Sequence, residues 1–251
     1  MTTQALFLTL IFLDGEKELS AAELGNVTFR ITDKTGKPIP CRIHLKNAAG
    51  LPQRAKNLPF WRDHFVCPGE AKLSLPTGKY TFEIERGPEY QRHSGAFELA
   101  TAAEKTIDIR LKRIANLAEQ GWYSGDLHVH RKPEDVPLLM QAEDLHVAPV
   151  ITWWANPRRI RTLWRDRELP AETLHKLPGK RFYDVMAGED EREAGALLYF
   201  HLRQPLLFSE PNAEYPSPMK YVAQARKNKD VWIDIEKPFW WHVPLWLADG
   251  N

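Results

Sequence analysis

Cysteine is scarce in this chain, and it lacks long apolar runs and an excess of charge of one sign. Its 251 residues include two cysteines, Cys41 and Cys67, too few for a disulfide-rich scaffold. A disulfide across a β-sandwich and a pair of buried thiols both remain open for them. No apolar run approaches the roughly 20 residues of a membrane-spanning helix, so we expect no transmembrane span. The formal net charge of +1 predicts neither a nucleic-acid partner nor an anionic membrane surface.

The N-terminal segment, residues 1–25, carries an apolar run at residues 5–13. This run has the length of a signal-peptide core, but no Lys or Arg precedes it and Asp14 follows it directly. It is therefore either the remnant of a signal peptide or a first strand. We favour an extracytoplasmic location, periplasmic or secreted, over a cytoplasmic one.

Residues 26–115 show short alternating segments that are separated by turns. Alternation of apolar and polar residues is typical of strands with one buried face, and Pro-Gly and Gly-Pro pairs punctuate them. No helical stretch intervenes, so we predict an antiparallel β-sandwich. The expected strands cover residues 26–33, 40–45, 71–75, 79–85 and 105–111.

Residues 116–251 change in character, because helix-like and strand-like segments alternate there. This alternation predicts a mostly parallel sheet or barrel. No Gly-x-Ser-x-Gly elbow is present, which disfavours covalent serine catalysis. The expected strands are residues 122–130, 147–153, 182–187, 196–201 and 231–235, and the expected helices are 133–146 and 219–227.

The expected strand 122–130 carries Asp126, His128 and His130 at alternate positions. Alternate side chains of a strand project from one face, so a carboxylate and two imidazoles share that face. Imidazole nitrogen suits zinc, manganese or iron, and Asp126 could orient a histidine or accept a proton. The competing interpretation is an incidental His-x-His pair.

Further ligands should follow later strands. Glu189 is the first candidate, against the alternative of a surface acid in a charged loop. His201 is the second, against a core histidine. Trp153 and Trp154 could line a pocket for a small-molecule substrate, against simple core packing.

Two acids on the expected strand 231–235 and its end, Asp234 and Glu236, also remain open. They could lie at a barrel mouth near the metal. The simpler interpretation is a salt bridge with Lys237.

The stretch Gly121-Trp122-Tyr123-Ser124-Gly125-Asp126-Leu127-His128-Val129-His130 resembles the first metal motif of the PHP (polymerase and histidinol phosphatase) superfamily. Within that superfamily it is most similar to the carbaryl-hydrolase-like, CehA/McbA-type branch. Residues 142–150 also resemble this branch. The upstream sandwich resembles carboxypeptidase-regulatory-like or transthyretin-like domains. The resemblance implies a PHP-like (β/α) barrel over residues 116–251, with one to three divalent ions of zinc, manganese or iron. It further implies that His128 and His130 are first-motif ligands, Glu189 a bridging carboxylate and His201 a later ligand.

The implied activity is hydrolysis of ester, amide, carbamate or phosphoester bonds by a metal-bound hydroxide. Two departures qualify it: Thr152 is followed by Trp153 and Trp154 where many relatives have Asp-His, and fewer residues follow His130 than the roughly 200 of a full barrel. We therefore expect a partial barrel. Two interpretations stay open: a hydrolase, active or inactivated by truncation, and a non-catalytic extracytoplasmic binding module with a degenerate barrel.

Overall fold

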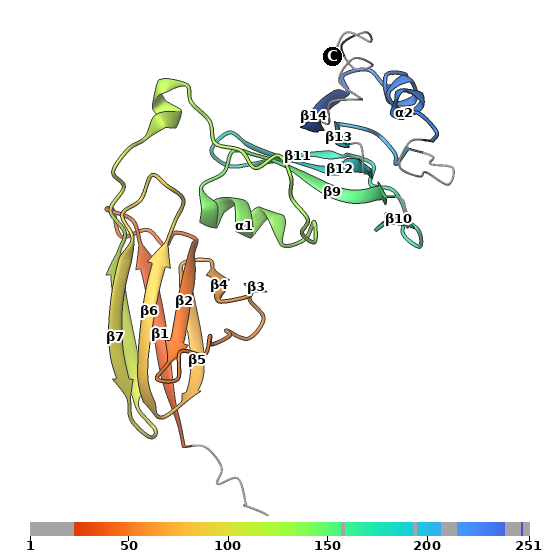
Figure 1. The fold of residues 1–251 in the computed structure, drawn as a ribbon. Coiled ribbons are helices and arrows are strands. Elements are labelled where there is room, and N and C mark those ends of the chain that lie inside the picture. Colours follow the sequence, from red (N-terminus) through yellow and green to blue (C-terminus); the bar gives the residue numbers. More distant parts are fainter. Residues whose placement is uncertain (1–22, 157–158, 193–194, 207–214, 239–246, 248–251) are drawn as a thin grey trace, which may run out of the picture.

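The computed structural model describes residues 23–156, 159–192, 195–206, 215–238 and 247. It has two parts, a β-sandwich and a C-terminal part that begins at Asn116 (Figure 1). The N-terminal segment expected at residues 1–25 lies almost wholly outside the described residues. Within the described residues, neither helix is long and apolar enough to cross a bilayer.

Two sheets face each other in the sandwich, as predicted. All five predicted strands are present, and β3, β4 and β7 are additional. Every pairing is antiparallel except that of β1 with β8, which run parallel. One sheet has the order β5 (Glu70–Pro76), β1 (Leu24–Thr32), β8 (Glu104–Arg110), and the other β3 (Phe60–Trp61), β4 (His64–Cys67), β2 (Cys41–Asn47), β6 (Gly78–Glu85), β7 (His93–Leu99).

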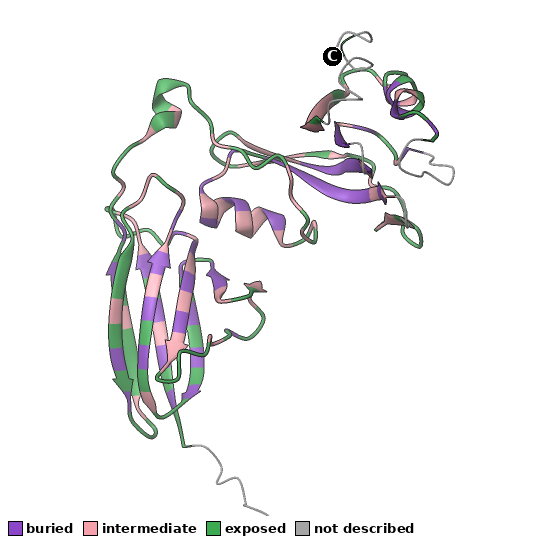
Figure 2. Cartoon of the chain, viewed as in Figure 1, coloured by how far each residue is buried: buried purple, intermediate pink, exposed green. Residues whose placement is uncertain are grey.

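The sandwich core follows from the alternation of apolar residues. Strand β5 alternates between exposed and buried at every position, and β1 buries every second residue over most of its length (Figure 2). Phe29 packs edge-on against Phe82 and Phe97 from the opposite sheet, with ring centroids 5.4 and 6.1 Å away. Burying each such side chain contributes about 1.5 to 3 kcal/mol to the free energy of unfolding, so these rings hold the two sheets together.

The two cysteines lie directly opposite each other on β2 and β4, which belong to one sheet. Both are buried free thiols. Of the two possibilities left open by the sequence, the pair of buried thiols is the one found, and a disulfide across the sandwich is not. The hydrogen bond with Cys67, together with burial, raises the pKa of Cys41 and keeps this thiol protonated.

The C-terminal part is a mixed sheet. A 3₁₀ turn (Leu117–Gln120), an extended segment at residues 122–130 and the helix α1 precede it. Strand β11 pairs with β12, off the main order of the sheet. The elements are α1 (Val136–Glu143), β9 (Val147–Asn156), β10 (Arg159–Thr162), β11 (Leu174–Leu177), β12 (Arg181–Arg192), β13 (Gly195–Phe200), α2 (Pro218–Ala225) and β14 (Trp232–Pro238), and the sheet order is β10-β9-β12-β13-β14.

The expectation of a mostly parallel sheet is wrong for the described residues. Strands β9 and β12 are parallel, whereas β10 with β9, β11 with β12, β12 with β13, and β13 with β14 are antiparallel. One reason is that β12 ends at Arg192 and β13 begins at Gly195. A parallel crossover needs a dozen or more residues, so this short connection forces an antiparallel pair. The described strands of residues 116–238 do not close into a barrel.

A buried ion network joins the two parts at Asp144, which caps α1 with a left-handed backbone. Asp144 Oδ1 accepts from Arg86 Nη2 at 2.9 Å, and Oδ2 accepts from Arg113 Nη2 at 2.9 Å. Arg181 of β12 donates to the same carboxylate. Gly87 lies against the backbone of Glu143, where an added Cβ would overlap it. Because Asp144 is buried and pairs with three arginines, its loss would leave the buried guanidinium of Arg86 without its carboxylate partner.

Candidate metal centre

Three side chains of the C-terminal part converge on one point. His128 Nε2 lies 2.8 Å from His130 Nε2, and each nitrogen lies 3.3 Å from Glu189 Oε2. Within the described C-terminal part, they are the only group of three or more His, Cys, Asp or Glu residues whose ligand atoms all lie within 4.8 Å of one another. The structure therefore brings together three of the four metal ligands expected from the sequence.

The extended segment at residues 122–130 positions both imidazoles. It is not a regular strand as expected, but isolated parallel bridges join Gly125 to Val147 and Val129 to Val150 of β9. Val129 packs against the apolar cluster that contains Val150. Since neighbouring side chains of an extended chain point to opposite sides, His128 and His130 project away from that cluster together.

Glu189 lies on β12, next to Trp154 of β9 in the parallel register. The alternative of a surface acid in a charged loop is wrong, because the strand continues to Arg192 and Glu189 is 2% exposed. Burial alone would raise the pKa of Glu189, but the hydrogen bond from His130 and the neighbouring positive charges outweigh it and lower the pKa. The buried carboxylate is thus held in the ionised form that a metal ligand needs.

The residue before Glu189 fits tightly. An added Cβ at Gly188 would overlap the indole ring of Trp153, so only glycine leaves room for that ring. The Trp153 Nε1–H donates to the Met186 carbonyl at 3.1 Å, which fixes the ring in the core. The position of Glu189 therefore depends on close packing beneath it.

Glu236 on β14 supports the cluster from outside. Its Oε1 lies 2.5 Å from His128 Nδ1, the ring nitrogen that faces away from the convergence point. Its other oxygen lies 3.5 Å from Lys237 Nζ, which also contacts Glu189 Oε1 at 3.4 Å and Glu191 Oε1 at 2.7 Å. The salt bridge with Lys237 expected for Glu236 is thus found, and the contact with His128 places the same carboxylate beside the candidate metal centre.

The donor set fits a divalent ion. Ligand atoms around a tetrahedral zinc lie roughly 3.3 Å apart, because each is about 2.0 to 2.2 Å from the ion. Two of the three observed separations are 3.3 Å, and the His128–His130 separation of 2.8 Å needs to widen by about 0.5 Å to match. Two imidazoles and one carboxylate with an open fourth position are typical of catalytic zinc sites.

Asp126 does not join the cluster. It is exposed, and its Oδ1 accepts from the His128 backbone N–H at 3.0 Å. This hydrogen bond fixes the backbone between Asp126 and His128. Asp126 therefore influences the position of His128 through the main chain and does not contact its ring.

His201 lies apart as well, directly after β13. Its backbone N–H donates to Asp184 Oδ2 at 2.6 Å, and its Nδ1 donates to the Asp230 carbonyl at 3.2 Å. It lines a separate cavity of about 450 Å³ together with Asp184 and Asp234. The structure thus places His201 at a different surface from His128 and His130.

The two tryptophans have different surroundings. Trp153 is 2% exposed and belongs to the core, as the structural alternative predicted. Trp154 is half-buried and meets His130 edge to face at 5.6 Å, while Arg161 lies over its ring at 5.1 Å. Only Trp154 of the pair lines a cavity beside a candidate ligand.

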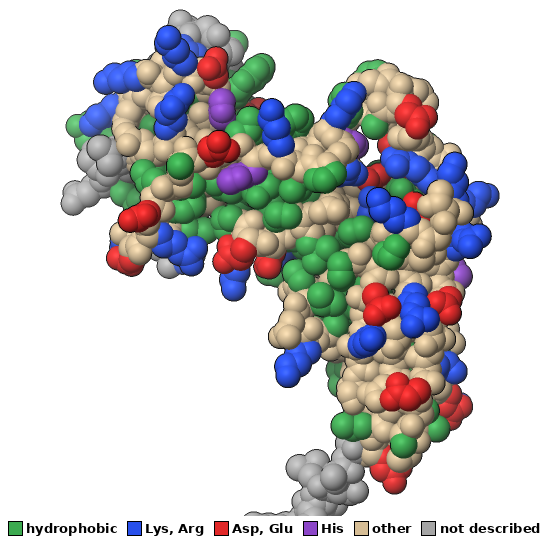
Figure 3. All heavy atoms as spheres, turned by 180° about the vertical axis from the view of Figure 1, so that it is seen from behind, with side chains coloured by type: hydrophobic (Ala, Val, Ile, Leu, Met, Phe, Trp, Pro, Cys, Tyr) green, Lys and Arg blue, Asp and Glu red, His purple; other side chains and the backbone are tan. Residues whose placement is uncertain are grey.

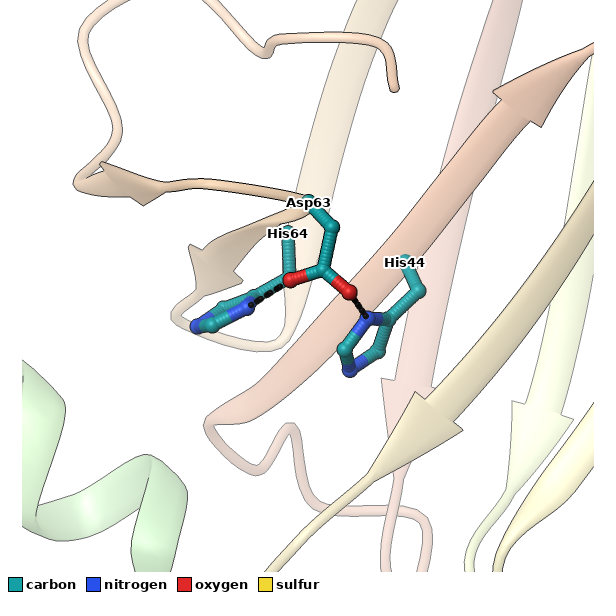
Figure 4. Close-up of side chains that lie close together, drawn as sticks. All are labelled: His44, Asp63 and His64. Atoms are coloured by element: carbon teal, nitrogen blue, oxygen red, sulfur yellow. Dashed lines mark hydrogen bonds and ion pairs between the residues drawn. The ribbon is translucent and has the colours of Figure 1, made fainter. Parts of the chain in front are cut away.

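A second histidine cluster lies on the sandwich, and the sequence analysis missed it. His44 of β2 and His64 of β4 point their Nδ1 atoms at opposite oxygens of Asp63, at 3.1 and 3.0 Å (Figure 4). The Asp63 carboxylate lies between the two rings and forms one hydrogen bond with each of them. The cluster clamps the β3–β4 hairpin (residues 60–67) onto β2. Sequence spacing could not predict this cluster, because His44 and the hairpin are brought together only by the pairing of β2 with β4.

No protein-family description and no curated protein matches the chain. Solved structures resemble parts of it weakly. The minor pilin GBS52 of Streptococcus agalactiae is 22% identical with a TM-score of 0.32, covering 38% of this chain and 47% of that one. The Bacillus anthracis TIE protein is 18% identical with a TM-score of 0.29, covering 45% and 20%. Phospholipase PlaB from Legionella pneumophila is 12% identical with a TM-score of 0.26, covering 37% and 25%. The matches span less than half of each of these chains, and likenesses this weak imply no function.

Proposed function

We propose that the chain is a metal-dependent hydrolase that acts on an ester, amide, carbamate or phosphoester bond. The convergence of His128 Nε2, His130 Nε2 and Glu189 Oε2 on one point carries the proposal. A divalent ion held there would supply a water of lowered pKa and a Lewis acid for the bond that is cleaved. Zinc, manganese and iron all accept this donor set.

Each residue of the cluster has a distinct task in this proposal. Glu236 accepts the Nδ1–H of His128, which leaves Nε2 without a proton and turned toward the ion. Lys237 Nζ lies 3.4 Å from Glu189 Oε1 and 2.7 Å from Glu191 Oε1, so its charge offsets that of these acids without occupying the convergence point. Asp126 is proposed as a positioning residue that holds the main chain of His128.

The proposed ancestry is a PHP-like barrel. In support, the segment at residues 122–130, β9 and β12 lie side by side and parallel, with α1 connecting the first two. Ligands come from the first and third of these elements, as expected where strand ends carry a site. The antiparallel β13 and β14 depart from such a barrel.

Metal content and hydrolysis test the proposal together. Zinc, manganese and iron are quantified in protein purified without chelator, beside hydrolysis of p-nitrophenyl acetate, p-nitrophenyl phosphate and 1-naphthyl N-methylcarbamate. We expect about one ion per chain and hydrolysis of at least one substrate, both lost in His128→Ala/His130→Ala. The matched control His93→Ala, which removes an exposed imidazole from β7, retains both.

A variant of the second cluster separates the two candidate groups. His44→Ala/His64→Ala should leave the metal content unchanged, because those rings are bound to Asp63 by hydrogen bonds. Wild-type protein that holds no metal and hydrolyses none of the substrates would contradict the proposed function and favour a non-catalytic binding module. Hydrolysis that survives in His128→Ala/His130→Ala would also contradict it, because the activity would then lie at another site.

A further inference from the structure

A cavity of about 680 Å³ lies between the sandwich and the C-terminal part. The sandwich contributes the β3–β4 hairpin and the segment before it, including Arg54, Phe60 and Trp61, and the C-terminal part contributes His130 and Trp154. Because His130 is one of the three converging ligands, the cavity borders the candidate metal centre. Hydrophobic side chains gather where the two parts meet (Figure 3).

Positive charge concentrates on this cavity. Arg54, Arg131 and Lys132 line it, and Asp135 is the single carboxylate among the described residues of its lining. Within the described part of the chain, none of the three cations forms an ion pair, unlike the paired arginines at Asp144.

The guanidinium groups of Arg54 and Arg131 stack on aromatic rings and form no ion pair with a carboxylate of the described residues. Arg131 Cζ lies 3.9 Å from the ring centroid of Trp61, and Arg54 Cζ lies 4.2 Å from that of Phe60. Stacking on an aromatic face leaves the N–H edges of a guanidinium available for a planar oxyanion. Arg131 belongs to the C-terminal part and Trp61 to the hairpin, so this contact joins the two walls of the cavity.

The cavity also offers flat apolar surface. The Trp61 side chain is 47% exposed even with Arg131 stacked on it, and Trp154 lies against His130 on the other wall. The exposed Trp61 and the half-buried Trp154, beside guanidinium groups without an ion pair, match a ligand that has both a flat body and an anionic group.

We propose that this cavity binds the substrate, and that the substrate is a small aromatic organic anion with a hydrolysable bond, such as an aryl phosphoester or an aryl ester that carries a carboxylate. The assignment rests on the proposed function. The anionic group lies against Arg54 and Arg131, the flat body lies against Trp61 and Trp154, and the bond to be cleaved faces His130. The sandwich is then one wall of the substrate site.

Binding of 1-naphthoate to chelator-treated protein tests the proposal without requiring metal or activity. Isothermal titration compares 1-naphthoate with neutral 1-naphthalenemethanol and with acetate, which lacks a ring. We expect 1-naphthoate to bind at least about tenfold more tightly than either, since charge-assisted hydrogen bonds and ring burial act together. Equal affinity for the three probes, or no binding of 1-naphthoate, would overturn the proposal.

Charge variants locate the binding site. Arg54→Gln/Arg131→Gln should weaken 1-naphthoate binding by about tenfold or more and leave 1-naphthalenemethanol unchanged. The matched control Lys79→Gln/Lys105→Gln removes two exposed positive charges from β6 and β8 and should bind as the wild type does. Equal affinities in the two double variants would refute the assignment.

Trp61→Ala tests the role of the sandwich separately. It should weaken 1-naphthoate and 1-naphthalenemethanol alike, because both lose the same aromatic wall. Unchanged binding of both probes would contradict a sandwich wall. Thermal unfolding of each variant verifies that it is folded.

Metal analysis distinguishes failure of this proposal from failure of the proposed function. Chelator-treated wild-type protein should lack the ion and still bind 1-naphthoate. Wild-type protein that binds 1-naphthoate but no ion keeps the cavity assignment as a ligand site and refutes the hydrolase. Protein that binds an ion but not 1-naphthoate refutes the cavity assignment alone.

Discussion

Replacing Glu236 by glutamine should weaken metal binding without removing a ligand. The carboxylate oxygen lies 2.5 Å from His128 Nδ1 and fixes both the ring orientation and the tautomer. Glutamine is nearly isosteric but neutral, so it accepts a weaker hydrogen bond and leaves the imidazole less basic. Loss of such an outer partner typically costs 10- to 100-fold in metal affinity, which is about 1.4 to 2.7 kcal/mol.

A competition titration against a chromophoric chelator measures the dissociation constant of zinc for each variant. The control is Glu191→Gln, which removes a negative charge that contacts Lys237 at 2.7 Å but touches neither histidine. We expect the control to change the constant by less than about threefold, because an exposed charge pair contributes little.

Equal effects of the two substitutions would show that net charge alone matters and would refute an orienting role for Glu236. An unchanged dissociation constant in Glu236→Gln would refute its contact with a metal-bound histidine.

Three further predictions concern stability. Gly188→Ala forces a methyl group into the Trp153 ring, and urea unfolding should show a loss of about 3 kcal/mol or more; an unchanged midpoint would contradict the packing. Asp144→Ala leaves the buried guanidinium of Arg86 uncompensated and should cost about 3 to 5 kcal/mol by the same assay, whereas a loss under about 1 kcal/mol would refute a buried junction. Burial lowers the pKa of His64 below 6.5, although the hydrogen bond to Asp63 opposes the shift. The unfolded chain therefore takes up the proton first, so the free energy of unfolding should fall as pH drops below about 6.5, and His64→Gln should flatten that slope; an equal slope in both proteins would contradict it.

The sandwich was predictable where alternation is strong. Strands β1 and β5 bury every second residue over most of their length, so their period alone identified them. Strand β7 was not predicted, because its first half is mostly exposed and only Phe97 and Leu99 of the strand are buried. Gly95 in that half lies against the ring of Phe82, and the alternation of apolar and polar residues along the chain does not predict this contact.

The extent of β12 could not be predicted from composition. Its end, residues 189–192, carries four charged residues and was interpreted in one alternative as a surface loop. Asp190 and Arg192 pair with each other in two hydrogen bonds of 2.7 Å while almost fully buried. Paired charges can be buried, whereas unpaired ones cannot, and pairing becomes visible only in three dimensions.

The candidate metal centre was likewise predictable from local spacing, but its long-range contacts were not. The alternate spacing of His128 and His130 predicted one shared face, and the position of Glu189 just after an expected strand made it a candidate. The contact with Glu236 spans 108 residues of sequence and depends on the pairing of β13 with β14. The sequence alone left that residue open between two roles.

Anomalous diffraction from crystals grown with zinc tests the central claim most directly. The account predicts an anomalous peak about 2.0 to 2.2 Å from His128 Nε2, His130 Nε2 and one oxygen of Glu189. A peak elsewhere, or no peak at this point with zinc present above the protein concentration, would contradict it.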